Sequence, residues 1–131
     1  MWTAGPIRKS FTQTYKPFTI RDMNKSNSIN RVELQGRAGT VRISPAIGSI
    51  AANFSLMTES PVISVEGKKL VETTWHNVLA VEGGEVCLEG ITRGSLVRLT
   101  GRLRTVKYTA SDGTERTFTE VVADSLKVLE R

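Results

Sequence analysis

Arginine and aromatic side chains recur in the second half of this sequence at the two-residue spacing that places side chains on one face of a β-strand. Counting by twos between residues 95 and 109 groups on one face Leu96, Arg98, Thr100, Arg102, Arg104, Val106 and Tyr108. The opposite face of that run holds Val97, Leu99, Gly101 and Leu103, so one face is apolar and the other is rich in arginine. In an earlier run, the same count groups Trp75 with Thr73, Asn77, Leu79 and Val81.

These residues together could bind single-stranded nucleic acid, because aromatic rings stack on bases and cations follow the phosphates. The expected stacking residues are Trp75 and Tyr108, and the expected phosphate contacts are Arg98, Arg102 and Arg104. Weaker candidates for phosphate contacts are Arg37, Lys68 and Lys69. Each residue alone has a simpler explanation, since a row of arginines is often a solvated strand face and a tryptophan often packs in a core. Their joint placement favours the binding interpretation.

Residues that enzymes use for covalent or acid–base chemistry are scarce in this chain. His76 is the only histidine and Cys87 the only cysteine, so neither a Cys/His zinc site nor an intrachain disulfide can form. No Gly-x-Ser-x-Gly, phosphate-loop or dinucleotide-binding motif is present. We therefore expect a protein that is not an enzyme and needs no metal or cofactor. Cys87 is expected to be a small apolar filler rather than a reactive thiol.

Most of the positive charge lies near the N-terminus. The 131-residue chain has a formal net charge of +5, and residues 1–30 carry five basic side chains against Asp22 alone. Basic arms are frequent in nucleic-acid-binding proteins, because lysine and arginine release counterions from phosphates, although they also serve solubility. The longest apolar runs, such as residues 78–81, are too short to span a membrane, and residues 1–20 lack the hydrophobic block of a secretory signal. We expect a cytoplasmic protein without a membrane partner.

Residues 1–29 differ in composition from the rest of the chain. Thr, Ser, Asn and Lys dominate, and the sparse apolar residues show no period. We interpret them as a basic N-terminal extension, and residues 30–131 as the binding domain. The extension holds four of the eight aromatic residues of the chain, namely Trp2, Phe11, Tyr15 and Phe18. These rings could order on nucleic acid, but we favour packing on a neighbouring subunit, because a docked arm loses no further conformational entropy at each binding event.

From Asn30 onward, β-branched residues alternate with polar ones in short runs, which predicts an all-β fold. The five predicted strands span residues 31–43, 49–58, 70–81, 95–109 and 115–129. Gly36 and Gly39 interrupt the first strand where a closing sheet needs a bulge or a tight bend. Glycines also bracket residues 85–89, which leaves room for about one helical turn. This order predicts an OB-fold, a five-stranded Greek-key barrel, although an SH3-like barrel or a small sandwich would use similar strands.

Several segments, in order along the chain, carry a family resemblance. They are NRVELQGR at 30–37, ANFSLMTES at 52–60, ETTWHNV at 72–78, RGS at 93–95, GRLRT at 101–105, DG at 112–113 and TEVVA at 119–123. Together they resemble bacterial single-stranded DNA-binding proteins from Asn30 to the end of the chain.

This resemblance implies an OB-fold that binds single-stranded DNA without strong sequence preference and protects it during replication, recombination or repair. Trp75 matches a stacking tryptophan of the family, and Tyr108 matches an aromatic stacking position on the fourth strand. The family assembles as homotetramers, usually through dimers built on the first strand, which implies subunit contacts at Val32 and Leu34. His76 falls at a position that supports subunit contacts rather than DNA.

The chain also departs from the family pattern. Pro61 and Val81 stand where the family carries aromatic residues, the helical insert is short, and the chain ends at Arg131 without a glycine-rich linker and acidic tip. A diverged member is therefore expected. The alternatives are a primosomal replication protein, which shares the fold and binds as a dimer, and an OB-fold assembly module that binds no nucleic acid.

Overall fold

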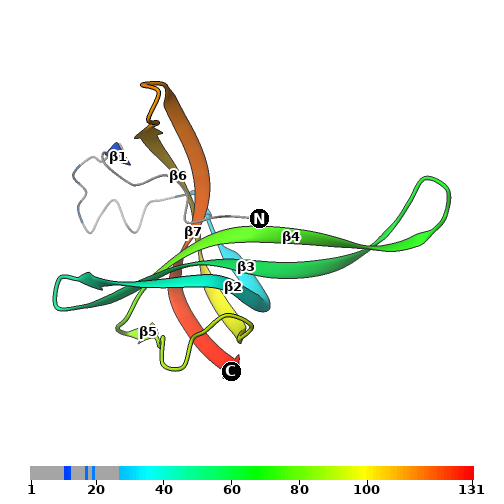
Figure 1. Cartoon of the computed structure of the whole chain (residues 1–131), viewed down its shortest axis with the longest axis horizontal. Coiled ribbons are helices and arrows are strands. Elements are labelled where there is room, and N and C mark those ends of the chain that lie inside the picture. The colour runs from blue at the N-terminus through cyan, green and yellow to red at the C-terminus, as the bar shows by residue number, and fades with distance from the viewer. Residues whose placement is uncertain (1–10, 13–16, 18, 20–26) are drawn as a thin grey trace.

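The computed structural model describes residues 11–12, 17, 19 and 27–131, in which every regular element is a β-strand (Figure 1). The strands are β1 (Phe11–Thr12), β2 (Val32–Ala46), β3 (Ser49–Ile63), β4 (Lys69–Val81), β5 (Glu85–Val86), β6 (Leu96–Thr109) and β7 (Glu115–Glu130). The expectations for Trp2, Tyr15 and Phe18 lie outside the described residues.

Five of these strands close into a barrel. The sheet order is β1-β6-β2-β3-β4-β7-β5, and a further pairing of β6 with β7 joins the two ends of the five-strand run. All barrel pairings are antiparallel except β4 with β7, which is parallel and limited to Val78↔Val121 and Leu79↔Val122. The predicted five-stranded OB-type barrel is confirmed. A register shift between Ala38 and Val41 also confirms the irregularity expected near Gly39.

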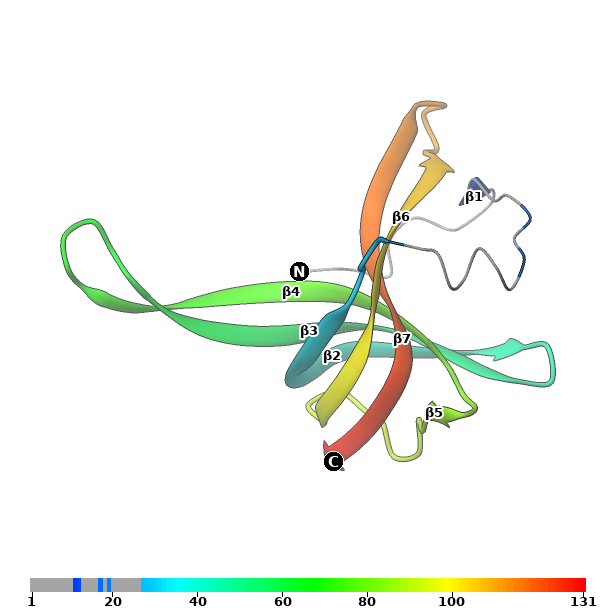
Figure 2. The ribbon, with the colours of Figure 1, turned by 180° about the vertical axis from the view of Figure 1, so that it is seen from behind.

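Three hairpins project beyond the barrel (Figures 1 and 2). The longest joins β3 to β4, which stay in register from Ala51↔Val81 out to Ile63↔Lys69. The strand predicted to end at residue 58 therefore continues to Ile63, and only residues 64–68 form the turn. The β2–β3 hairpin projects on the opposite side, and the β6–β7 hairpin rises between the two.

The helical turn expected at residues 85–89 is absent, since the described part of the chain holds no helix. Glu85 and Val86 instead pair in parallel with Ser125 and Leu126 of β7. Glycines have low helix propensity, and the local backbone bonds go to β7: the Cys87 N–H donates to the Leu126 carbonyl at 3.0 Å. The extended backbone alternates its side chains, so Val86 is buried and Cys87 is exposed. The prediction that Cys87 is an apolar filler is therefore wrong.

The core fills the barrel from all five of its strands. Its buried members are Ala38, Ala52, Phe54, Leu56, Val78, Ala80, Val86, Leu88, Ile91, Val97, Leu99, Val121 and Leu126. Along β6, the side of the strand whose residues are buried switches at Gly101, where pairing with β2 ends. Val97 and Leu99 are buried as expected, but beyond that point Leu103 is 48% exposed and Val106 only 1%. The predicted division of β6 into one apolar and one arginine-rich face thus fails in its second half, because the twisted strand leaves the barrel core there.

A first prediction concerns Ser55, which is 0% exposed and whose Oγ has no hydrogen-bond partner. Because an unsatisfied buried hydroxyl costs about 1–3 kcal/mol, Ser55→Ala should leave the free energy of unfolding unchanged or raise it. Ser95 is the matched control: it is equally buried, but its Oγ accepts the Thr92 N–H at 3.0 Å. Ser95→Ala should lower the free energy of unfolding, measured by urea denaturation. Equal losses in the two variants would contradict the prediction.

Candidate nucleic-acid interface

Trp75 lies on the outer face of the β2–β3–β4 part of the barrel. It pairs with Met57 of β3, and Met57 pairs in turn with Arg37 of β2. Directly opposed residues of antiparallel strands project to the same face, so Trp75 and Arg37 share one surface. Trp75 as a whole residue is 37% exposed, which leaves part of its side chain open to solvent. The structure thus brings together the predicted stacking tryptophan and one predicted cation.

Arg37 is held by weak surface interactions. Its Nη1 donates to the Gly94 carbonyl at 3.2 Å, and its Nη2 lies 3.7 Å from Glu130. Both side chains of this ion pair are about half exposed, so the pair contributes at most about 1 kcal/mol. A phosphate could therefore replace Glu130 at little cost.

A small cavity adjoins Trp75 where β4 and β7 part. Its volume is about 180 Å³, and it is lined by Trp75, His76, Asn77, Leu103, Thr119, Glu120 and Val121. Asn77 bridges the two strands, since its Nδ2 donates to the Thr119 carbonyl at 3.3 Å. Asn77 was visible in the sequence, because it shares the alternation of Trp75. Leu103 was missed, because the sequence placed it on the core side of β6.

Arg104 is committed to an internal ion pair. Its Nε donates to Oε2 of Glu120 at 3.0 Å, and its Nη2 binds the same oxygen. The Glu120 side chain is 1% exposed and that of Arg104 is 24% exposed. The expectation that Arg104 contacts phosphates is therefore corrected: its guanidinium neutralises a buried carboxylate.

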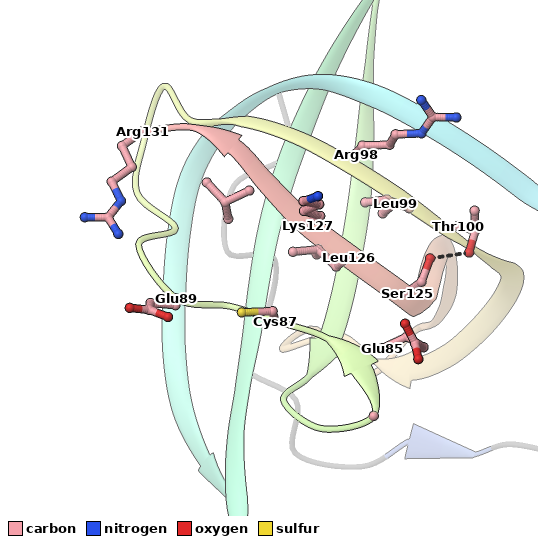
Figure 3. Close-up of a pocket in the computed structure, with 12 residues that line it drawn as sticks. Glu85, Cys87, Glu89, Arg98, Leu99, Thr100, Ser125, Leu126, Lys127 and Arg131 are labelled. Carbon is pink, nitrogen blue, oxygen red and sulfur yellow. Dashed lines mark hydrogen bonds between the residues drawn. The ribbon is translucent and has the colours of Figure 1, made fainter.

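Arg98 and Arg102 take no part in that ion pair. Arg98 forms an exposed ion pair with Glu33 at 3.6 Å and lines a second groove, of about 650 Å³, between β6–β7 and the segment after β5 (Figure 3). Arg98 does not line the Trp75 cavity. Arg102 is exposed and forms no ion pair with any residue that the structure describes. The structure thus gives Arg98 and Arg104, which the sequence grouped on one surface, different surroundings.

Tyr108 lies on the β6–β7 hairpin. It is half-buried and packs against Phe118, with ring centroids 5.7 Å apart and planes tilted by 59°. Phe11 of β1 pairs beside it on the edge of β6. Tyr108 stands three residues beyond Thr105, which pairs with Thr119 at the Trp75 cavity. Tyr108 itself does not line that cavity, so the two predicted stacking residues do not share it.

Lys68 and Lys69 are exposed at the end of the β3–β4 hairpin. Lys68 lies 3.6 Å from Glu66, and both side chains are more than 70% exposed. Such a pair is largely screened by solvent. Lys69 starts β4, six residues before Trp75. Both lysines are thus available to an extended ligand that follows the hairpin towards Trp75.

Val32 and Leu34, which the sequence predicts at a subunit contact, are partly buried in this single chain. Both side chains pack against the core of their own barrel, because the strand alternation turns them inward. The exposed residues of this part of β2 are Glu33 and Gln35.

His76 is half-buried, opposite core residue Leu56, and bonds to the Thr58 hydroxyl through Nε2 at 2.8 Å. Burial lowers the pKa of His76 below its ordinary value, because it disfavours the charged imidazolium. The neutral ring is therefore part of its own barrel wall.

The described residues contain no helix able to span a membrane, and no group of three or more acidic, histidine or cysteine side chains among them could hold a metal ion.

Comparisons with known proteins identify the class. Residues 29–129 match the model of the Single-strand binding protein family. A single-stranded DNA-binding protein of Neisseria meningitidis serogroup A is 36% identical over 106 residues, which cover 78% of this chain and 60% of that protein. A single-stranded DNA-binding protein of Xanthomonas campestris pv. campestris is 34% identical over 108 residues, covering 79% of this chain and 62% of that protein.

Two solved structures are also similar. The Plasmodium falciparum SSB in complex with ssDNA has a TM-score of 0.68 and 25% identity, covering 81% of this chain and 99% of that one. A deletion mutant of the Thermus aquaticus single-stranded DNA binding protein has a TM-score of 0.64 and 20% identity, covering 78% of this chain and 51% of that one, and supports the fold alone.

The closed five-stranded barrel is an OB-fold. With its match over residues 29–129, the chain belongs to the single-strand binding protein family. It spans about three fifths of the length of the curated relatives named above.

A second prediction follows from the buried ion pair. Arg104→Met should lower the free energy of unfolding by about 3–5 kcal/mol, because it leaves a buried carboxylate without the guanidinium. The double variant Arg104→Met/Glu120→Leu should recover most of that loss. The control is Arg98→Met, whose exposed pair with Glu33 should be worth at most about 1 kcal/mol. Urea denaturation measures all three, and equal losses for the two single variants would refute the assignment.

A third prediction concerns pH. The pKa of His76 is lowered in the folded state, so the unfolded chain binds its proton at higher pH. The contribution of neutral His76 to the free energy of unfolding is complete above the pKa that His76 has in the unfolded chain, about 6.5. This contribution is lost as the pH falls below that value. Because His76 is the only histidine, His76→Gln should flatten the decline of stability between about pH 7 and 5.5. An unchanged decline in the variant would show that other groups cause it.

Proposed function

We propose that this chain binds single-stranded DNA without strong sequence preference, by stacking of bases on Trp75 and by contacts of basic side chains with phosphates. The observation that carries the proposal is the exposed indole of Trp75 on the same face as Arg37. The names of the relatives support it, as does the similar Plasmodium falciparum structure, which is a complex with single-stranded DNA. By protecting exposed single strands, the chain would serve DNA replication, recombination or repair.

The phosphate contacts are assigned to side chains that can leave their present partners cheaply. Arg102 forms no ion pair in the described part of the chain, and the pairs of Arg37 and Lys68 are exposed. Lys69 is exposed as well, and Arg98 is a weaker candidate because it lies at the second groove. Tyr108 is proposed as a second stacking residue, on the β6–β7 hairpin. Cations that contact only phosphates position the strand and read no sequence.

The domain division and the assembly are part of the same proposal. Residues 30–131 form the binding domain, and residues 1–29 are a basic extension to it. The chain assembles as a homo-oligomer, a tetramer rather than a dimer. One structural feature supports contacts through β2: residues 32–36 pair with β6 on one side, and pairing with β3 begins only at Arg37. A strand edge of this kind can pair with a second copy, with Glu33 and Gln35 facing outward. The mass of the intact chain in solution tests the assembly.

The test of DNA binding is a fluorescence titration in a Trp2→Phe background, in which Trp75 is the only tryptophan. A thymine homopolymer should quench Trp75 at low salt, and the affinity should fall as salt is added. No quenching and no binding by a label-free method would refute the proposal and favour an assembly module.

A fourth prediction assigns the energy to individual residues. Trp75→Ala should weaken binding by about tenfold or more, since stacking on one ring is worth about 1–3 kcal/mol. Ile47→Ala, at the exposed turn between β2 and β3, is the control and should bind as the parent does. Arg102→Gln should reduce the salt slope by about 0.7. A folded Trp75→Ala variant with parental affinity would remove Trp75 from the site.

A further inference from the structure

We propose that Gly39 is a positioning residue for Trp75: because it lacks a side chain, the indole can lie across β3 and present a single ring face to one base. This inference rests on the proposed stacking role of Trp75 and adds the residue that sets the geometry of the ring.

The indole reaches across a whole strand. Trp75 belongs to β4 and Gly39 to β2, and β3 lies between them. A Cβ atom on Gly39 would stand only 2.9 Å from Cζ3 of Trp75 and 3.5 Å from its Cη2. These two atoms belong to the six-membered ring, at the end of the indole away from its own backbone. The ring must therefore extend from β4 over β3 to β2.

Ser55 of β3 marks the inner side of the ring. It lies on the same face of β3 as Met57, the partner of Trp75. It is 0% exposed although it is on the outer face of the sheet, and its Oγ stands 2.3 Å from the same Cβ position on Gly39. We attribute this burial to the indole that lies above it. One ring face therefore packs on β3, and the exposed 37% of Trp75 belongs to the opposite face and the rim. Such a ring stacks on one base and cannot insert between two.

The requirement for glycine at this position is spatial. Gly39 is not among the glycines with positive φ, so its backbone conformation is open to any residue. It lies within the register shift between Ala38 and Val41, where β2 comes close to the ring. A contact under 3.0 Å to a ring packed on a sheet is relieved by lifting the ring. Gly39→Ala should therefore tilt Trp75 away from the sheet.

The experiment compares Gly39→Ala with its parent in the Trp2→Phe background. We expect about a tenfold loss of affinity for a thymine homopolymer, comparable to loss of one stacked base, together with greater quenching of Trp75 by acrylamide in the free protein. The loss must vanish when Gly39→Ala is placed on Trp75→Ala, because a residue that acts through the indole has nothing to position there. Equal losses with and without the indole would overturn the proposal.

Two controls separate Trp75 from the other neighbours of Gly39. The double variant Gly39→Ala/Ser55→Ala removes the close approach of the new Cβ to the Ser55 Oγ and keeps its contact with Trp75. It should therefore bind DNA as weakly as Gly39→Ala. Recovery of affinity would assign the effect to Ser55 and overturn the proposal. A Cβ on Gly48 would have no atom within 4 Å, and the φ of Gly48 is +70°. Gly48→Ala should therefore lower the free energy of unfolding and leave the affinity for DNA unchanged. A loss of affinity equal to that of Gly39→Ala would also overturn the proposal.

A further variant covers the case in which Gly39→Ala fails to fold. Trp75→Ala has no ring to reach β2, so Gly39→Ala should fold in that background and bind as Trp75→Ala alone. Failure to fold there too would show that the clash is not with the indole and would overturn the proposal. The outcomes also distinguish the two levels of inference. If Trp75→Ala binds DNA as tightly as the parent, the proposed stacking function is wrong. If Trp75→Ala binds more weakly but Gly39→Ala binds as the parent does, only the positioning role of Gly39 is wrong.

Discussion

Closure of the barrel depends on two places where a strand passes too close to the backbone of its neighbour to carry a side chain. A Cβ atom on Gly36 would stand 1.9 Å from the Met57 carbonyl oxygen, and one on Gly101 would stand 2.2 Å from the Val122 carbonyl oxygen. Both obstacles are backbone atoms, so no rotamer change can relieve them. Gly36 lies where β2 passes from β6 to β3, and Gly101 lies where β6 leaves β2 and the register with β7 shifts. These two crossings fix the curvature of the sheet, and with it the row that joins Arg37, Met57 and Trp75.

The barrel itself was predictable, because every one of its strands alternates apolar and polar residues over enough length to define a face. Gly36 and Gly39 also marked the irregular part of β2. What failed was the helical turn at residues 85–89: five residues allow either one helical turn or a short strand, and the choice depends on the free edge of β7, which is distant in sequence. The second strand, predicted to end at residue 58, is longer in the structure for a related reason. The β3–β4 hairpin runs past Pro61 because an exposed ladder needs no core-facing pattern to form.

The candidate site was predictable in part. The alternation of β4 grouped Trp75 with Asn77 on one face, but it could not decide which face lies outside the core. The register places Arg37 on the same face as Trp75, and the sequence could not show that pairing. The division of β6 into two faces failed beyond Gly101 because alternation describes one strand locally, while the inner side of a coiled strand changes along its length. Leu103 and Val106 exchange their expected environments for this reason. Nor does the pattern reveal Glu120, which is buried beside Val121, since two adjacent buried residues break the alternation.

The ion pair of Arg104 with Glu120 shows how the free energy of an existing ion pair decides which cations are free to contact a phosphate. Glu120 lines the cavity beside Trp75, so an unneutralised carboxylate there would repel a phosphate chain. A swing of Arg104 to a phosphate would leave that buried charge without the guanidinium, at a cost of about 3–5 kcal/mol. A phosphate contact at a solvated surface recovers less, because its Coulomb energy is screened by water and salt. Arg104 therefore acts by cancelling Glu120. In the function proposed above, the phosphate contacts fall to Arg37, Arg102 and the hairpin lysines, which are exposed and of which only Arg37 and Lys68 form ion pairs within the described part of the chain, both weak. The electrostatic surface around Trp75 is thus set as much by a buried pair as by the exposed cations.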